Sequence, residues 1–310
     1  MSKVVNQITL TQDQKKVDCP ANSTVLQATL AAKINHTHAC GGVGKCSTCR
    51  IGVIEGIEHC QPRNKAEQKI ASKLHFPDQI RLACQTTIMG DILIRRLIYD
   101  DLDMEIVDQQ FSDQSGVALG TERSLTIVFT DIVNYTSFAE QLPSYDIVHV
   151  LNRYFKTMNE VIQKYHGFIS DTAGDGILAL FGNNGSQENS VLQAIKAVKD
   201  MQEILTVFNT YLQDNYNRTF AIRAGIHYGD VILGSFDIGS LKKVAVIGDN
   251  VNLASRIETA NKNLGTGMLL SAQAYEQVKK EYPKYESHRT SLKGKTGEFE
   301  LYEIITEKQN

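Results

Sequence analysis

The distribution of cysteine is the feature that most restricts what this chain can fold into. All six cysteines lie within the first 84 residues, and the remaining 226 contain none. No apolar run reaches the roughly 20 residues that span a bilayer, and the N-terminus lacks the apolar segment of a secretory signal. We therefore expect a cytoplasmic protein with no membrane partner, in which the clustered thiols serve a metal site rather than disulfides.

Four cysteines follow the spacing Cys-x5-Cys-x2-Cys, with the fourth after 34 further residues. Four thiolates are what a [2Fe–2S] cluster requires, two for each iron. The string CGGVGKC places three glycines in the first gap, so the loop can bring backbone N–H groups close to sulfur. A zinc site would normally show two Cys-x2-Cys pairs. A phosphate loop is excluded, because Ala39 and Cys46 stand where that motif needs glycine and serine or threonine.

Charge divides the chain into three segments. Residues 1–96 carry 13 basic and 7 acidic side chains, 97–120 carry 6 acidic and no basic ones, and 121–310 carry 19 basic and 22 acidic ones. At roughly 150 residues per domain, the length predicts about two domains. We expect domains at 1–96 and 121–310, joined by an acidic linker or transducer at 97–120. This linker is either solvated or docked on the basic first domain, because opposite charges attract.

The second domain alternates strands and helices. SLTIVFTDIV predicts a strand, HGFISDTAGDGILALFG a hairpin that turns at 174–176, and AIRAGIHYG and DVILGSF two strands on either side of Gly229–Asp230. Helices are predicted at about 145–165, at about 189–214 and after IGD. The first of these is expected to place one apolar face inward, formed by Val148, Leu151, Phe155, Met158 and Ile162. The order strand–helix–strand–strand–helix–strand predicts a ferredoxin-like α/β sandwich.

Two aspartates stand out from these patterns. Asp131 ends an apolar strand and Asp175 lies in the hairpin turn, and amphipathic periodicity explains neither. Carboxylates on adjacent strands could share two divalent cations that bridge a nucleoside triphosphate. Each aspartate taken alone also fits a turn or capping role.

Residues 1 to about 96 resemble a [2Fe–2S] ferredoxin of the β-grasp fold, on the loop CGGVGKCSTC and the strand RLACQ. The resemblance implies a [2Fe–2S] cluster and a redox partner, although the basic charge balance differs from that of many electron carriers. The cluster ligands that it implies are Cys40, Cys46, Cys49 and Cys84. Cys19 and Cys60 are then expected to be small apolar fillers or loop thiols.

Five strings resemble, in order, a class III adenylate/guanylate cyclase catalytic domain over roughly residues 122–305. They are FTDIVNYTSF, AGDGILALFG, GIHYGDVILG, IGDNVNLASRIE and LKGKTGEFELYEI. The fold class is thus α+β, with an N-terminal β-grasp domain and a C-terminal ferredoxin-like sandwich of class III cyclase type. The resemblance also implies that Asp131, Asp175 and the carbonyl of Ile132 bind two Mg²⁺ or Mn²⁺ ions.

The same resemblance assigns the remaining catalytic positions. Asn252 would orient the ribose, and Arg256 would offset charge on the transferring phosphorus. Lys293 would bind the triphosphate, with Lys295 as the alternative. The resemblance further implies a head-to-tail homodimer, in which the metal-binding aspartates of one chain face Asn252, Arg256 and Lys293 of the other.

Purine choice depends on Asp171 and Ala245, which match neither the Lys and Asp or Thr of adenylate cyclases nor the Glu and Cys of guanylate cyclases. A carboxylate at 171 could accept hydrogen bonds from guanine or from the adenine amino group. We favour ATP as substrate, with GTP as the alternative. The cluster is expected to regulate the cyclase. An electron-transfer ferredoxin with a non-catalytic dimerisation domain is the competing interpretation, whereas nucleic-acid binding is not expected, because no aromatic-interleaved basic stripe is present.

Overall fold

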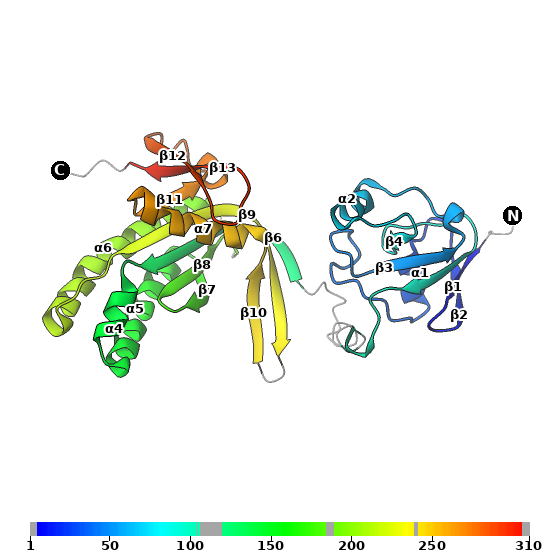
Figure 1. Cartoon of the computed structure of the whole chain (residues 1–310), viewed down its shortest axis with the longest axis horizontal. Helices are drawn as coiled ribbons and strands as arrows, with labels where there is room; N and C mark the ends of the chain where they lie inside the picture. The colour runs from blue at the N-terminus through cyan, green and yellow to red at the C-terminus, as the bar shows by residue number, and fades with distance from the viewer. Residues whose placement is uncertain (1–4, 104, 106–119, 184–188, 239–240, 306–310) are drawn as a thin grey trace. The chain divides into compact units, whose positions relative to one another are not determined.

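The computed structural model describes residues 5–103, 105, 120–183, 189–238 and 241–305, with side chains outside 235–244. The chain divides into two compact units, Met1–Thr121 and Glu122–Asn310 (Figure 1). Most of the acidic linker predicted at 97–120, together with its predicted docking, lies outside the described residues. Among the described helices, none combines the length and the apolar character needed to cross a membrane.

The first unit is built on a five-stranded sheet with the order β2-β1-β5-β3-β4. Its strands are β1 (Asn6–Leu10), β2 (Lys15–Cys19), β3 (Arg50–Glu55), β4 (Ile80–Leu82) and β5 (Ile92–Arg96). Its helices are α1 (Val25–Ala31), η1 (Ile57–His59) and α2 (Lys65–Leu74). Thr24 begins α1 in a capping box with Gln27. The parallel pair of β1 and β5 at the centre of the sheet completes the predicted β-grasp arrangement.

The two cysteines outside the proposed ligand set lie in the apolar core of this unit. Cys19 is 1% exposed and Cys60 is 8% exposed, and both belong to the cluster of buried side chains that includes Ile8 and Ile94. Burial raises the pKa of both thiols. Both positions agree with the predicted role as small apolar fillers.

The second unit contains a seven-stranded path, β12-β13-β11-β9-β6-β8-β7, with β10 paired to β9. Its strands are β6 (Gly120–Ile132), β7 (Phe168–Ala173), β8 (Gly176–Phe181), β9 (Ile222–Ile238), β10 (Leu241–Ile247), β11 (Met268–Ser271), β12 (Tyr285–Ser291) and β13 (Glu298–Ile304). Its helices are α4 (Tyr135–Gln141), α5 (Ser144–Lys164), α6 (Ser190–Tyr216), α7 (Asp249–Leu264) and α8 (Ala272–Glu276). The order around α5, the β7–β8 hairpin, α6 and β9 confirms the predicted α/β sandwich.

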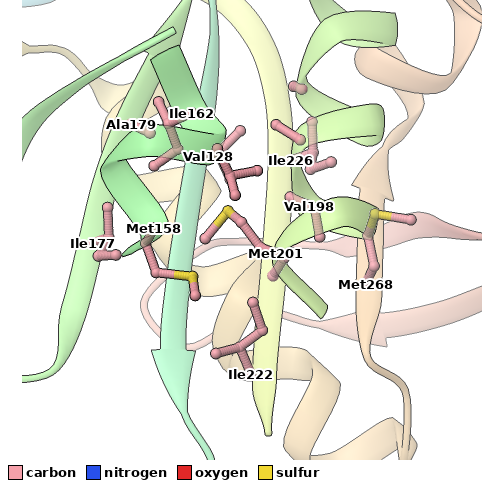
Figure 2. Close-up of a cluster of buried hydrophobic side chains, with 14 of the residues drawn as sticks. Val128, Met158, Ile162, Ile177, Ala179, Val198, Met201, Ile222, Ile226 and Met268 are labelled. Carbon is pink, nitrogen blue, oxygen red and sulfur yellow. The ribbon is translucent and has the colours of Figure 1, made fainter. Parts of the chain in front are cut away.

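The two faces of this sheet bury different sets of side chains. Even-numbered residues of β6, such as Val128, pack with α5 and α6 in the main core, where Met158 and Met201 also lie (Figure 2). Odd-numbered residues, such as Leu125 and Ile127, pack with Ala254 of α7 on the other face. Asp131 continues the odd-numbered series, so its strand directs it to the side of the sheet that α7 covers.

Two predictions about this unit are wrong. The predicted face of α5 is wrong at Val148, which is 56% exposed, whereas Val150 and Tyr154 are buried. The other four predicted residues are buried or pack against the core. The two strands predicted on either side of Gly229 and Asp230 are a single strand, since β9 runs through both residues and is 17 residues long. Gly229 instead allows a close approach, because a Cβ there would lie 2.7 Å from Asn250 Nδ2.

Gly225 sets the contact between β9 and α7. A Cβ at this position would lie 2.2 Å from Glu258 N and 2.6 Å from Ala254 O, both backbone atoms. We expect Gly225→Ala to lower the free energy of unfolding of the second unit by about 3 kcal/mol, because the helix must shift to make room. Denaturant titration measures the effect. Gly267→Ala is the matched control, since its Cβ would meet only Gln202 Nε2 at 3.4 Å. Equal stability of the two variants would contradict this packing.

Candidate functional site

The cysteine-bearing loop lies between α1 and β3, and Cys84 follows β4, which pairs with β3. Gly41, Gly42 and Gly44 have φ values of 70°, 83° and 73°, a region that favours glycine. A Cβ at Gly44 would lie 3.0 Å from the Gln85 amide, so a side chain would be both strained and crowded there. The glycines of the motif therefore give this loop its shape.

The four predicted ligand thiols lie together at this loop. Cys46 donates a hydrogen bond to Cys40, and Cys49 donates one to Cys84. The pKa of Cys40 is lowered to about 4, first by the hydrogen bond from Cys46 and, against the effect of burial, by backbone N–H groups of the loop. Gln85 Nε2 also donates to Cys84 Sγ at 3.4 Å. Four adjacent thiols that accept backbone hydrogen bonds fit a [2Fe–2S] cluster.

A buried ion pair supports the strand that leads to Cys84. Arg81 of β4 donates from Nε and Nη2 to the two oxygens of Glu67 in α2, both at 2.9 Å. Leu82 N donates to the same carboxylate at 2.8 Å. The Arg81 and Glu67 side chains are 5% and 1% exposed. This bidentate pair fixes α2 to the last residues before the fourth thiol.

The residues that follow β5 contact residues on either side of the cysteine-bearing loop. Leu97 N donates to Arg50 O at 3.1 Å, next to Cys49. Thr37 Oγ1 donates to Ile98 O at 3.3 Å. The Arg96 guanidinium lies 3.8 Å from the centre of the Tyr99 ring. The start of the predicted linker at 97–120, called the connector, is thereby attached to residues on both sides of the cysteines.

In the second unit, the structure brings the predicted metal-binding residues together. Asp131 is near the end of β6, and Asp175 lies in the turn between β7 and β8. β8 pairs with β6 along the sheet. Asp175 Oδ2 accepts a hydrogen bond from Ile132 N at 2.9 Å. Burial and then the neighbouring Asp131 raise the pKa of Asp175 to about 6. Two adjacent carboxylates that repel each other in this way fit divalent cations, which would relieve the repulsion.

The predicted residues for the nucleotide form a second group on α7 and the β12–β13 hairpin. Asn252 is exposed and Arg256 is half-buried, one turn apart on α7. A Cβ at Gly294 would lie 3.4 Å from Arg256 Nη2, so the guanidinium lies against this hairpin. Lys295 Nζ pairs with Asp249 Oδ1. Lys293 is exposed and its ammonium makes no ion pair within the described residues.

The two predicted purine-contacting positions lie on different strands. Asp171 is exposed on β7, at an irregularity of its pairing with β8, and its Oδ1 accepts from Thr172 N at 2.9 Å. Ala245 is half-buried on β10, where it pairs with Gly234 of β9. Both positions are accessible, as contacts with a base would require.

Sequence reasoning missed two charged residues close to the metal-binding group. Glu258 of α7 is 9% exposed, and its Oε1 lies 3.6 Å from Nε of Arg223 on β9. The sequence could have indicated that Glu258 is buried, because it follows Leu253, Ala254 and Ile257 on the apolar side of α7. An acidic residue in a buried helix stripe needs a partner or a function.

Comparisons with known proteins identify two families. The family described as "Adenylate and Guanylate cyclase catalytic domain" matches residues 117–306, and the family described as "2Fe-2S iron-sulfur cluster binding domain" matches residues 8–89. The chain is 31% identical over 210 residues to an adenylate cyclase of Anabaena cylindrica and 29% identical over 184 residues to adenylate cyclase 1 of Rhizobium meliloti. It covers 40% and 28% of these relatives' lengths, and the alignments take in 65% and 59% of this chain.

Two solved structures have the fold of the second unit. The guanylyl cyclase Cya2 is 30% identical with a TM-score of 0.56, and the alignment covers 62% of this chain and 97% of that one. The adenylyl cyclase CyaB from P. aeruginosa is 25% identical with a TM-score of 0.55, covering 61% of this chain and 97% of that one. The fold is thus shared with cyclases of both nucleotide classes.

Proposed function

We propose that this chain converts ATP to 3′,5′-cyclic AMP and pyrophosphate. It belongs to the adenylate and guanylate cyclase catalytic-domain family and also carries a 2Fe-2S cluster-binding domain. The paired carboxylates of Asp131 and Asp175 are the single observation that carries this proposal. They lie where the family motifs place the metal-binding residues, and Asn252, Arg256 and Lys293 fill the other catalytic positions.

In the proposed reaction, the ribose 3′-hydroxyl attacks the α-phosphorus and pyrophosphate leaves. Two divalent cations bound at Asp131, Asp175 and the Ile132 carbonyl would supply Lewis-acid stabilisation of the attacking and leaving oxygens. Asn252 would orient the ribose by hydrogen bonding, and the Arg256 guanidinium would offset the negative charge that develops on the phosphoryl oxygens.

Lys293 is the better choice for binding the triphosphate. The Lys295 ammonium already pairs with Asp249, whereas Lys293 is exposed on the same hairpin, beside the Gly294 that Arg256 contacts. A lysine free of a carboxylate partner can give its full charge to the phosphates. We expect Lys293→Ala to raise KM for the nucleotide more than Lys295→Ala does, measured by steady-state kinetics. The reverse order would transfer the role to Lys295.

The proposed assembly is a head-to-tail homodimer. Asp131 and Asp175 form one group and Asn252, Arg256 and Lys293 another, and each chain would contribute one group to each of two shared sites. Sedimentation and complementation between Asp131→Asn and Arg256→Ala chains test this arrangement, since two inactive variants should together regain part of the activity.

Substrate choice rests on Asp171 and Ala245. We expect kcat/KM for ATP to exceed that for GTP at least tenfold. Asp171 can accept from either base, but Ala245 has no donor for the guanine O6 and offers only apolar contact, which adenine tolerates better. The double variant Asp171→Glu, Ala245→Cys should move this ratio toward GTP by about tenfold. Side-by-side assays with Mg²⁺ and Mn²⁺ measure both effects. A tenfold preference of the wild type for GTP would overturn the choice of ATP.

Regulation of the cyclase by the cluster completes the proposal. The support is the pair of hydrogen bonds that join Leu97 to Arg50 and Ile98 to Thr37, because these attach the start of the connector to residues that flank the cysteines. A change at the cluster would shift the populations of connector states and, through them, cyclase activity. Anaerobic assays of oxidised, reduced and cluster-free protein, with visible absorbance recorded in parallel, test the idea. Equal activity in all three states would contradict it.

A further inference from the structure

Helix α7 carries charged residues on two opposite sides. Arg256 lies against the β12–β13 hairpin at Gly294. Glu258 is two residues further on, which corresponds to roughly 200° around the helix axis. It is therefore turned toward the sheet, where it is buried. The helix that bears the phosphoryl-contacting arginine thus also places a carboxylate inside its own unit.

The position of Glu258 is fixed by the contact of α7 with β9. Gly225 lets the helix backbone approach the strand at Glu258, and Arg223 lies two residues earlier on the same face of β9. Glu258 Oε1 is 3.6 Å from Arg223 Nε, and Thr259 Oγ1 donates to Glu258 Oε2 at 3.3 Å. The Arg223 side chain is 17% exposed, so the pair is largely shielded from water.

This pair lies beside the metal-binding aspartates of the same chain. β9 is the neighbour of β6 in the sheet, and Val133 N donates to Ala221 O at 2.8 Å, where β6 ends and β9 is about to begin. Burial and then the carboxylate of Asp131 raise the pKa of Glu258 to about 7, while Arg223 acts in the opposite direction. Three carboxylates and one guanidinium therefore share this side of the sheet.

Stability alone is a poor reason for this arrangement. Arg223 Nε and Glu258 Oε1 have no hydrogen-bond partner within the described residues, and 3.6 Å is too long for a hydrogen bond between them. A buried ion pair with incomplete hydrogen bonding recovers little of its desolvation cost. The Glu258 carboxylate acts on the neighbouring aspartates more strongly than it would in water, because charges interact more strongly where water is excluded.

We propose that Glu258 and Arg223 are positioning residues of the metal centre, in which the Glu258 carboxylate favours divalent cations at Asp131 and Asp175 and offsets the positive charge of Arg223. The inference rests on the proposed function for the identity of the metal centre. Glu258 would thus be a third carboxylate that does not bind the cations itself but adds its negative charge to that of the two aspartates.

Mn²⁺ binding to the 310-residue protein tests this role without turnover. The protein is titrated with Mn²⁺ in the presence of 3′-deoxy-ATP, which lacks the attacking hydroxyl, and free Mn²⁺ is read from its EPR signal. We expect Glu258→Gln to weaken Mn²⁺ binding about tenfold, because it removes a negative charge and leaves Arg223 as an unpaired cation. Glu276→Gln, on an exposed side chain of α8, should leave binding as in the wild type.

The double variant Glu258→Gln, Arg223→Gln separates electrostatics from folding. Removing the unpaired guanidinium should restore Mn²⁺ affinity to within about threefold of the wild type. If the pair were merely structural, the double variant would bind Mn²⁺ no better than Glu258→Gln. Unchanged affinity in Glu258→Gln, or a double variant that binds less tightly than it, would overturn the proposal. Wild-type protein that binds Mn²⁺ normally but forms no cyclic nucleotide would instead count against the proposed function alone.

Mixed dimers assign Glu258 to one of the two shared sites. Asp131→Asn chains combined with Arg256→Ala chains would form one complete site, whose aspartates come from the Arg256→Ala chain. Glu258→Gln placed in that chain should raise the Mn²⁺ concentration for half-maximal activity about tenfold, and more than the same change placed in the other chain. The opposite order would show that Glu258 acts on the partner's metals and would contradict the inference.

Discussion

Replacing Asp131 with asparagine should reduce cyclase activity by about three orders of magnitude. The substitution keeps the shape of the side chain but removes one of the two adjacent carboxylates that are proposed to hold the cations. Several kcal/mol of transition-state stabilisation come from such metals, and each 1.4 kcal/mol corresponds to about tenfold in rate. Cyclic nucleotide formation with saturating Mn²⁺ measures the loss.

Thermal unfolding of the same variant separates this role from a structural one. Asp131 raises the pKa of Asp175, so the two carboxylates repel each other in the metal-free protein. Removing one of them should therefore leave the melting temperature unchanged or raise it. Asp214→Asn, at an exposed position of α6, is the control for activity and stability. A melting temperature that falls together with activity would indicate a folding defect, and a wild type without activity would favour the electron-transfer alternative.

Replacing Glu67 with glutamine should cost the first unit about 3–5 kcal/mol, because it leaves the buried Arg81 guanidinium without its bidentate partner. That cost is a large part of the total stability of a small domain, which is about 5–15 kcal/mol. Since Arg81 and Leu82 lead directly to Cys84, cluster loading should fall as well. Denaturant unfolding and the visible absorbance of the full-length protein measure the two effects.

The control for this variant is Glu58→Gln. Glu58 is 70% exposed and lies 4.0 Å from His59, so its loss should change stability by less than about 1 kcal/mol. The cluster absorbance should remain as in the wild type. If Glu67→Gln were as stable and as fully loaded as Glu58→Gln, the ion pair would have no role in holding the strand before Cys84.

Sequence patterns predicted best those elements whose structure depends on residues close together in the chain. The cysteine spacing located the loop that brings Cys40 and Cys84 together, and the apolar strand that ends at Asp131 became β6. Gly229 was misassigned, because a glycine–aspartate pair is typical of a turn and the sequence does not show that Asn250 packs against it.

Other features depended on contacts between distant segments, which periodicity cannot supply. Val148 fits the same helical period as the buried residues of α5, and only the packing of α6 and β8 determines which of two adjacent stripes is inside. The partnership of Arg223 with Glu258 likewise joins a strand to a helix 35 residues later. Local propensity carries no information about such a pair.

The hydrogen bond from Leu97 N to Arg50 O means that two different stimuli would reach the connector in different ways. Reduction would add one electron and leave the four cysteines bound to iron. Loss of iron would instead leave four thiols that no metal joins, so that only the hydrogen bonds among them would hold the loop to which Leu97 and Ile98 are attached. We therefore expect iron starvation to change the start of the connector more than reduction does, so that the same cluster would distinguish the scarcity of a nutrient from the redox state of the cell.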